Sequence, residues 1–309
     1  MANILITGGA GNVGSSLAAR FIKNPENFVV IVDDISTGSM EKLPSKEYKN
    51  WKFVKADANN FEDIAPVLLH YGFDYVFHYA AVVGVQRTLN NPIKVLKDVD
   101  GIKHILNLSK STGVKRVFFS SSSEVYGEPF EIPQREETTP LNSRLPYAIV
   151  KNIGEAYLKS YQQEFGLDYT IFRFFNTYGP NQSADFVISR FIQLAHRGKD
   201  ITIYGDGSQT RTFCYIDDNT EVAEKCITEQ ICINETLNVG NDNEMTIVEL
   251  ANKIITQLGS SSKIIHLPPL PEGDMKRRCP DISRMKQIIG RPLTTLEEGI
   301  EKTAKVLNA

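Results

Sequence analysis

The sequence predicts an α/β protein in which a doubly wound parallel sheet is followed by a smaller C-terminal α/β domain. Over the first 175 residues, apolar strand-like runs alternate with helical patterns, and beyond about residue 176 the elements become shorter. The length of 309 residues also exceeds the usual size of a single domain. We therefore assign residues 1–175 to a first domain and 176–309 to a second, with some segments of the second returning to the first.

Six short apolar runs mark the strands of the predicted sheet: 3–7, 28–32, 51–54, 74–80, 115–120 and 169–174. Helical patterns lie between most of them: one ending near Lys23, then 61–71, 92–112 and 146–165. Such alternation predicts a parallel sheet that is buried on both faces and joined by right-handed crossovers.

The second half predicts four further helices, at 184–198, 218–230, 246–258 and 294–307. Thr246 with Glu249, and Thr294 with Glu297, have the spacing of capping boxes, in which side chains satisfy exposed amides at a helix start. The proline-rich segment 267–273 is expected to be an exposed connection.

Composition excludes several classes of function. A net charge of −3 without a basic block gives no electrostatic footprint for nucleic acid or an anionic membrane. No apolar run approaches the roughly 20 residues that span a bilayer, and the N-terminus lacks a signal-peptide pattern. The 4 cysteines and 5 histidines show no metal-ligand spacing, and His78 is interpreted as a core histidine. We expect a cytoplasmic protein with reduced thiols and no metal site.

A glycine-rich turn follows the first strand. Gly8, Gly11 and Gly14 are spaced Gly-x-x-Gly-x-x-Gly between a strand and a helix. Glycine allows the backbone to turn tightly and approach a pyrophosphate, whose charge then lies at the helix N-terminus. Asp33 ends the second strand, where a carboxylate can bind the adenosine ribose. With Asp34 beside it, a ribose phosphate would be repelled, so the sequence favours NAD over NADP.

The segment "YAIVK" places Tyr147 and Lys151 one helical turn apart, on the same helix face. A nearby ammonium group favours the ionised form of a phenol, whose pKa is ordinarily near 10. Alone, a Tyr and a Lys at this spacing are usually surface residues. After a dinucleotide-binding pattern and a serine-bearing strand end, the pair predicts a base that takes the proton of a sugar hydroxyl while a hydride leaves the carbon that bears it. The serine-bearing strand end "SSSSEVYG" at 120–127 lies about 25 residues upstream. Its Glu124 has two interpretations: a structural acid bonded to loop amides, or a carboxylate that faces the sugar.

Together these motifs resemble the extended short-chain dehydrogenase/reductases of the nucleotide-sugar epimerase/dehydratase group. The resemblance covers essentially the whole chain. It is carried by "TGGAGNVGS", "HYAA" (78–81), "SSSEVYG" (121–127), "YAIVK", "RFFNTYGP" (173–180), "YGDGSQTRTFCYIDD" (204–218) and "RRCPDIS" (277–283). It implies a Rossmann domain on a seven-stranded sheet, a cleft beside a smaller substrate domain, a tightly held NAD, and a homodimer formed through helices around 92–112 and 147–165.

The resemblance also implies residue roles. Tyr147 would be the base, Lys151 would hold the nicotinamide ribose, and Ser122 would bond the reacting hydroxyl. The expected cofactor-binding residues are Gly8, Gly11, Asn12, Val13, Gly14, Asp33, Asp57, Ala58, Ala80, Ala81, Ser120, Tyr147 and Lys151. The expected substrate-binding residues are Ser122, Ser123, Asn176, Arg211 and Arg278, with Glu124 added to the catalytic set. Asn176 and Arg211 would hold the nucleotide diphosphate, and Arg278 is a further candidate for that role or a solvated basic turn.

The chain departs from each subgroup at some position. Ser123 precedes Glu124 where 4,6-dehydratases carry an aspartate, which disfavours dehydration. UDP-glucuronate decarboxylases are similar in the Ser-Glu pair and in "RRxPDI", yet carry an arginine where this chain has Asn181. Pro271 stands where typical 4-epimerases have arginine, and Asp98 replaces the family's asparagine.

A further resemblance is to bacterial GDP-heptose 4-dehydrogenases of capsule polysaccharide biosynthesis. The common expectation is NAD-dependent oxidation at C4 of a nucleotide-linked sugar, by a 4-dehydrogenase or a 4-epimerase. The alternatives are a UDP-glucuronate decarboxylase and a non-catalytic NAD-binding sensor. Sensors typically lose the Tyr or the Lys, and both are present here.

Overall fold

The computed structural model describes residues 2–269 and 277–307, so part of the expected connection at 267–273 lies outside the described residues. Its centre is a seven-stranded sheet in the order β11-β6-β5-β4-β1-β2-β3, in which every neighbouring pair is parallel. The strands are β1 (Ala2–Thr7), β2 (Asn27–Asp33), β3 (Trp51–Lys55), β4 (Tyr75–His78), β5 (Arg116–Ser122), β6 (Asp168–Phe174) and β11 (Glu235–Val239). The predicted doubly wound α/β fold is confirmed.

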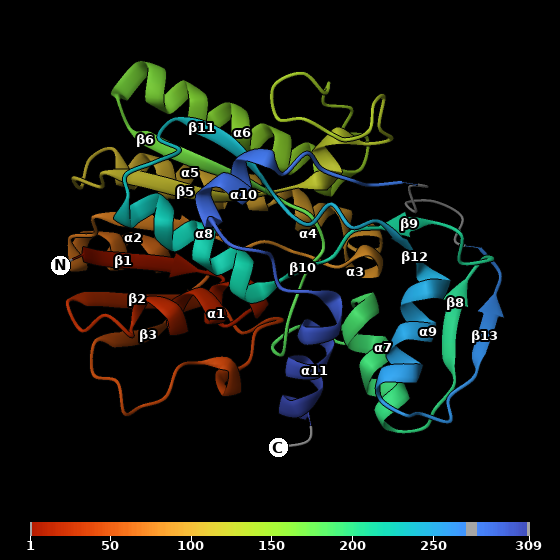
Figure 1. Cartoon of the computed structure of the whole chain (residues 1–309). Coiled ribbons are helices and arrows are strands. Elements are labelled where there is room, and N and C mark those ends of the chain that lie inside the picture. The colour runs from red at the N-terminus through yellow and green to blue at the C-terminus, as the bar shows by residue number, and fades with distance from the viewer. Residues whose placement is uncertain (1, 270–276, 308–309) are drawn as a thin grey trace.

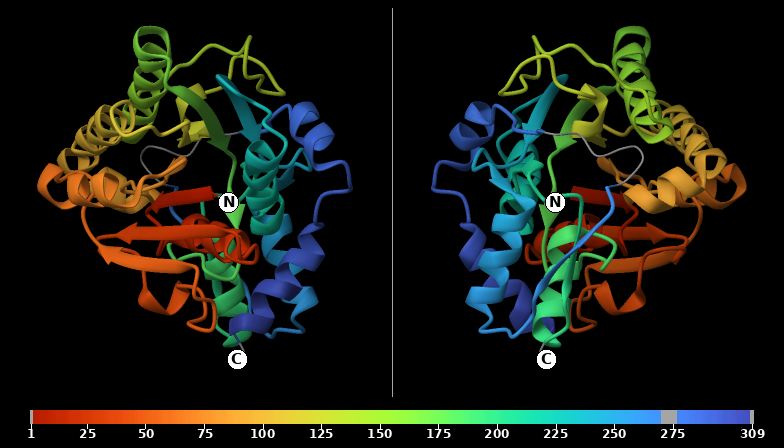
Figure 2. Two further views of the ribbon diagram at one scale, coloured as in Figure 1. Left: turned by 90° about the vertical axis from the view of Figure 1, so that its left-hand side faces the viewer. Right: turned by 90° about the vertical axis from the view of Figure 1, so that its right-hand side faces the viewer.

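Helices cover both faces of the sheet, as Figures 1 and 2 show. One hydrophobic core joins the sheet to α2 (Phe61–Tyr71), α5 (Asp98–Ser109) and α6 (Pro146–Phe165). The other core joins it to α1 (Asn12–Phe21), α8 (Ile216–Thr228) and α10 (Ser283–Ile289). The runs at the centre of the sheet are largely apolar because both faces of their strands are buried in this way, whereas β3 at the edge is only partly buried.

One predicted helix is interrupted. The pattern at 92–112 forms α4 (Pro92–Leu96) and α5, with Lys97 between them, after a short α3 (Val85–Asn90). The interruption precedes Asp98, whose buried carboxylate accepts hydrogen bonds from the Val82 amide at 2.8 Å and the Asn59 side chain at 3.0 Å. The start of α5 is therefore fixed by contacts with loops at the end of the sheet.

The second half of the chain both completes the sheet and builds a smaller unit. Strand β11 pairs with β6 at the edge of the sheet, and α8 and α10 pack behind it. The remaining elements share a third core, seen on the right of Figure 1. They are β7 (Thr177–Tyr178), α7 (Val187–His196), β8 (Ile201–Tyr204), β9 (Thr210–Arg211), β10 (Cys214–Tyr215), β12 (Met245–Thr246), α9 (Ile247–Gln257), β13 (Ile264–Leu267) and α11 (Leu296–Leu307). Two short 3-10 turns, η1 (Met40–Lys42) and η2 (Ser123–Tyr126), lie earlier in the chain and outside this core.

Of the two predicted capping boxes, one is confirmed and one is wrong by one residue. Thr246 and Glu249 bond reciprocally at the start of α9. At α11 the reciprocal pair is Thr295 with Glu298. Thr294 instead donates from its amide to Asp218 at 2.9 Å, because that carboxylate is buried and requires donors.

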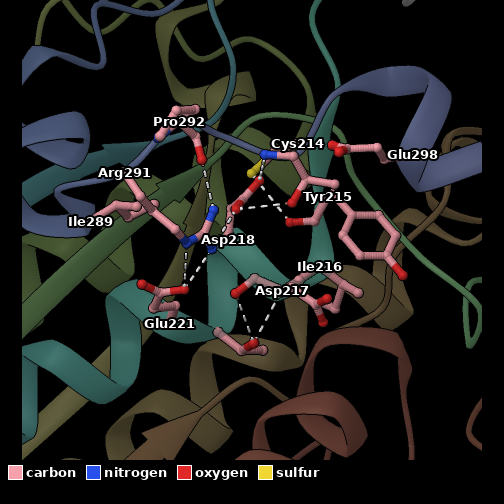
Figure 3. Close-up of polar contacts among 12 residues, drawn as sticks. Cys214, Tyr215, Ile216, Asp217, Asp218, Glu221, Ile289, Arg291, Pro292 and Glu298 are labelled. Carbon is pink, nitrogen blue, oxygen red and sulfur yellow. Dashed lines mark hydrogen bonds and ion pairs between the residues drawn. The ribbon is translucent and has the colours of Figure 1, made fainter. Parts of the chain in front are cut away.

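The same carboxylate joins α8 to the segment before α11. Figure 3 shows Arg291 reaching both Asp218, at 2.9 Å, and Glu221, at 2.5 Å. Asp218 is almost fully buried, whereas Arg291 is partly exposed. This cluster fixes the C-terminal segment against the back of the sheet. Within the described residues, no helix combines the length and apolar character that a membrane crossing requires.

Candidate active site

A cavity of about 560 Å³ lies where the carboxyl ends of the central strands meet the smaller unit. Every residue expected at the site lines it: Gly8, Gly11, Asn12, Val13, Gly14, Asp33, Asp57, Ala58, Ala80, Ala81, Ser120, Ser122, Ser123, Glu124, Tyr147, Lys151, Asn176, Arg211 and Arg278. Ligands of open parallel sheets bind at this edge of the fold.

The glycine loop has the geometry of a phosphate cradle. Gly8 has a φ of 67°, and a Cβ there would lie 2.7 Å from the Ala80 amide nitrogen. A Cβ on Gly14 would collide with the Gly8 carbonyl. Gly11 precedes α1 without a side-chain cap, so the first amides of the helix remain available to an anion. Asn12 has a buried Oδ1 without a partner at the same point.

Asp33 is fixed at the end of β2. One carboxylate oxygen accepts from the Ala10 amide at 3.0 Å and the other from the Ile35 amide at 2.8 Å. Burial raises the pKa of Asp33, and these two backbone bonds oppose that rise. The carboxylate is thus held in one orientation, where its remaining lone pairs can accept from ribose hydroxyls. The glycine loop and Asp33 together fit a dinucleotide.

At the carboxyl end of β5, three side chains lie close together in the cavity: those of Tyr147, Lys151 and Ser122. Ser122 lies near enough to Tyr147 to lower the pKa of its phenol, and Lys151 Nζ lies 5.7 Å from the Tyr147 ring centroid. Lys151 Nζ also donates to Ser120 Oγ at 3.4 Å. Burial raises the pKa of Tyr147, an effect that the Ser122 hydroxyl opposes, and burial lowers the pKa of Lys151 to about 8.

Asp98 belongs to this group, although the sequence marked it only as a departure from the family pattern. It lines the cavity from α5, and its charge raises the pKa of Lys151 against the effect of burial. Burial raises the pKa of Asp98 itself, while the Val82 and Asn59 bonds lower it. A buried carboxylate near a buried ammonium group favours the charged form of both.

Glu124 and Arg278 form an ion pair of 2.7 Å, with 17% and 8% of their side chains exposed. Glu124 lies in η2 directly after β5, while Arg278 comes from the segment before α10. The Glu124 carboxylate therefore faces a charged partner in the cavity. Its own amide is bonded to Ser122 Oγ at 3.2 Å, which links it to the Tyr147 group.

A second group of buried polar side chains is joined by hydrogen bonds and centred on Arg173. Arg173 binds Glu155 through two hydrogen bonds, of 2.9 and 2.7 Å, and donates to the Tyr126 hydroxyl at 2.8 Å. Glu155 also accepts from Ser121 Oγ at 2.6 Å. Ser121 also lines the cavity, so its hydroxyl connects this network to the candidate site.

The smaller unit contributes two of the expected diphosphate ligands. Asn176 has a φ of 40° and donates from Nδ2 to the Thr212 carbonyl at 2.9 Å. Arg211 is mostly buried in β9, on the same wall of the cavity. Both are brought to the cavity by the short strands that follow β6.

Comparison with known proteins agrees with this geometry. Residues 4–240 match the model of the NAD dependent epimerase/dehydratase family. The chain belongs to this family. It is 34% identical over 308 residues to UDP-glucuronic acid decarboxylase 3 of Arabidopsis thaliana, covering 96% of this chain and 86% of that protein.

Two solved structures extend the comparison. UDP-glucose 4-epimerase of Thermotoga maritima with UDP-glucose has a TM-score of 0.92 at 30% identity, covering 99% and 98% of the two chains. UDP-glucose 4-epimerase of Thermus thermophilus in complex with NAD has a TM-score of 0.90 at 26% identity, covering 99% of both chains. The expected family, Rossmann fold and NAD cofactor are confirmed. The chain is homologous to nucleotide-sugar epimerases and decarboxylases.

Proposed function

We propose that this protein oxidises C4 of a nucleotide-linked sugar to a 4-keto species, as a 4-dehydrogenase or a 4-epimerase. The observation that carries the proposal is the meeting of Tyr147, Ser122 and Lys151 in the cavity that the dinucleotide loop enters. Oxidation of a secondary alcohol requires a base that takes the hydroxyl proton and an acceptor that takes the hydride from the carbon bearing that hydroxyl.

The side chains divide this chemistry among them. Tyr147 takes the proton of the C4 hydroxyl, which Ser122 holds by a hydrogen bond. Lys151, held by Ser120 and near Asp98, stabilises the phenolate that the reaction needs, because burial alone keeps the phenol neutral. The glycine loop and Asp33 would hold NAD, which would supply the hydride acceptor for C4. Asn176 and Arg211 hold the diphosphate and so fix which ring carbon faces the tyrosine.

Decarboxylation of a UDP-linked uronic acid is the second candidate. It is favoured by the 34% identity to a UDP-glucuronic acid decarboxylase and by the Glu124–Arg278 pair. The first step would be the same, because a 4-keto group is placed β to the C6 carboxylate and makes loss of carbon dioxide possible. The two candidates differ in the substituent at C5 and not in the base.

One experiment tests the proposal and separates its branches. The NAD-loaded protein is incubated with UDP-, GDP- and dTDP-sugars, and the products are analysed by mass spectrometry. Loss of two hydrogens indicates a dehydrogenase, an isomer of unchanged mass an epimerase, and loss of carbon dioxide a decarboxylase. If no sugar nucleotide is converted and the bound cofactor is never reduced, the proposed function is wrong.

We also propose a homodimer formed through the helices around 92–112 and 147–165, which are α4, α5 and α6. Large apolar side chains on these helices are exposed, among them Ile93, Leu96, Ile149 and Phe165. Exposed apolar groups gathered on neighbouring helices are typical of an interface. Sedimentation equilibrium would test this, and a monomer at micromolar concentration would contradict it.

A further inference from the structure

Arg190 is the feature of the cavity that the expected site residues leave unexplained. It lies on α7, on the wall that the smaller unit contributes, together with Phe191 from the same helix and Tyr204 from the end of β8. Its guanidinium carbon is 5.6 Å from the Phe191 ring centroid and 5.9 Å from that of Tyr204. The guanidinium therefore lies near two aromatic rings, of which Phe191 is fully buried and Tyr204 is partly exposed.

The hydrogen-bonding capacity of this guanidinium is largely unused. Nη2 donates to the Thr202 carbonyl at the long distance of 3.4 Å, and Nε is buried without a partner. Over residues 2–269 and 277–307, no carboxylate lies within ion-pair distance of Arg190. A buried donor without a partner costs free energy, because it has lost its hydrogen bonds to water. A guanidinium offers five N–H groups in one plane and therefore favours a planar acceptor with two adjacent oxygen or nitrogen atoms.

The nucleobases differ in whether they offer such an acceptor. Guanine presents O6 and N7 side by side, and arginine binds both atoms at once. Adenine presents one acceptor beside an amino donor, and the O4 of thymine or uracil has no second acceptor next to it. Tyr204, which is partly exposed on this wall, supplies an aromatic face that suits a flat ring. Arg211 lies on the same wall and is the candidate for the diphosphate, which leaves Arg190 for the base.

We propose that this wall is a nucleobase subsite in which Arg190 selects guanine, so that the substrate is a GDP-linked sugar. The inference rests on the proposed function, because it assigns the nucleotide of the same substrate. It also departs from the relatives reported above, whose names and titles mention UDP.

The test measures binding and needs no turnover. GDP and UDP are titrated calorimetrically into the NAD-loaded wild type and into Arg190→Met, which keeps the aliphatic stem. We expect the wild type to bind GDP at least about 10-fold more tightly than UDP. Arg190→Met should lose about 10–100-fold in GDP affinity and change little for UDP, as expected for one two-pronged base contact.

Two further variants calibrate this result. Arg197→Met, on the exposed end of the same helix, should leave both affinities unchanged. Arg211→Met should weaken GDP and UDP equally, as a phosphate contact would. Thermal unfolding of each variant shows whether it is folded, and if Arg190→Met is not, Arg190→Lys keeps the charge without the planar fork.

Three outcomes would overturn the inference: equal loss of both nucleotides in Arg190→Met, no loss of either, or a wild type that does not prefer GDP. Selective GDP binding in a protein that oxidises no sugar nucleotide would contradict the proposed function alone. Oxidation of a UDP-sugar with no preference for GDP would contradict this inference alone.

Discussion

Replacing Glu124 with glutamine removes one charge from the cavity and keeps the shape of the side chain. In the structure its carboxylate is 2.7 Å from Arg278, and both side chains are largely buried. A hydrogen bond to a charged group contributes about 1.5–3 kcal/mol, so its loss corresponds to roughly 10–150-fold where the pair acts on the reacting sugar. We expect Glu124→Gln to lower the rate of C4 oxidation, or to change the product ratio, by a factor in this range.

The assay follows NADH formation in a single turnover and the products at completion, with NAD content measured separately. NAD binding should be unchanged, because the glycine loop and Asp33 lie at another part of the cavity wall. A double-mutant cycle with Arg278→Met should show a coupling of about 1–3 kcal/mol, since the partners touch. Arg277→Met is the matched control: it breaks a neighbouring ion pair to Glu244, of 2.7 Å and more exposed. Wild-type rate and product from Glu124→Gln would assign the residue to structure and refute this reasoning.

Three further predictions concern the cofactor and the base. Asp33→Ala should weaken NAD binding by about 1–3 kcal/mol and reduce its preference over NADP, because ribose hydroxyls lose their acceptor; equal wild-type affinities for the two cofactors in a titration would contradict this. Tyr147→Phe should retain the fold and NAD but lose about 10²–10⁴ in hydride-transfer rate, and near-normal turnover on the true substrate would exclude the proposed base. Lys151→Met should lower activity and move the pH optimum upward, since the ammonium that stabilises the phenolate is present below its pKa of about 8; an unshifted rate profile would argue against that role.

The local patterns predicted the fold well because each was decided by burial or by backbone geometry. Apolar runs such as 28–32 and 115–120 form central strands since both faces of the sheet are covered. Strand β11 escaped prediction because "ETLNV" is short and its partner β6 lies more than 60 residues earlier. Only tertiary pairing identifies it as a strand. The capping box near α11 was misplaced by one residue for a similar reason, because Thr294 is taken by Asp218 from α8.

The residues of the candidate site likewise fall into those that one segment of sequence predicts and those that only the folded chain brings together. Gly8 and Tyr147 could be found from sequence because their roles depend on spacing within one segment. The pairing of Glu124 with Arg278 could not, because the two residues come from distant segments that meet only in the folded chain.

Asp98 and Arg190 are two further residues whose surroundings the sequence did not predict. Both carry charge into the cavity, yet each lies within an ordinary helical pattern, and neither has a motif that reports its neighbours. What distinguishes them is their surroundings: Asp98 lies near a buried lysine, and Arg190 has no carboxylate near it within the described chain. The residues of the proposed C4 oxidation thus lie in short motifs, whereas the proposed choice of nucleotide depends on a side chain whose partner would be the ligand itself. Substrate assignment in this family therefore requires the unsatisfied groups of the cavity as well as its short motifs.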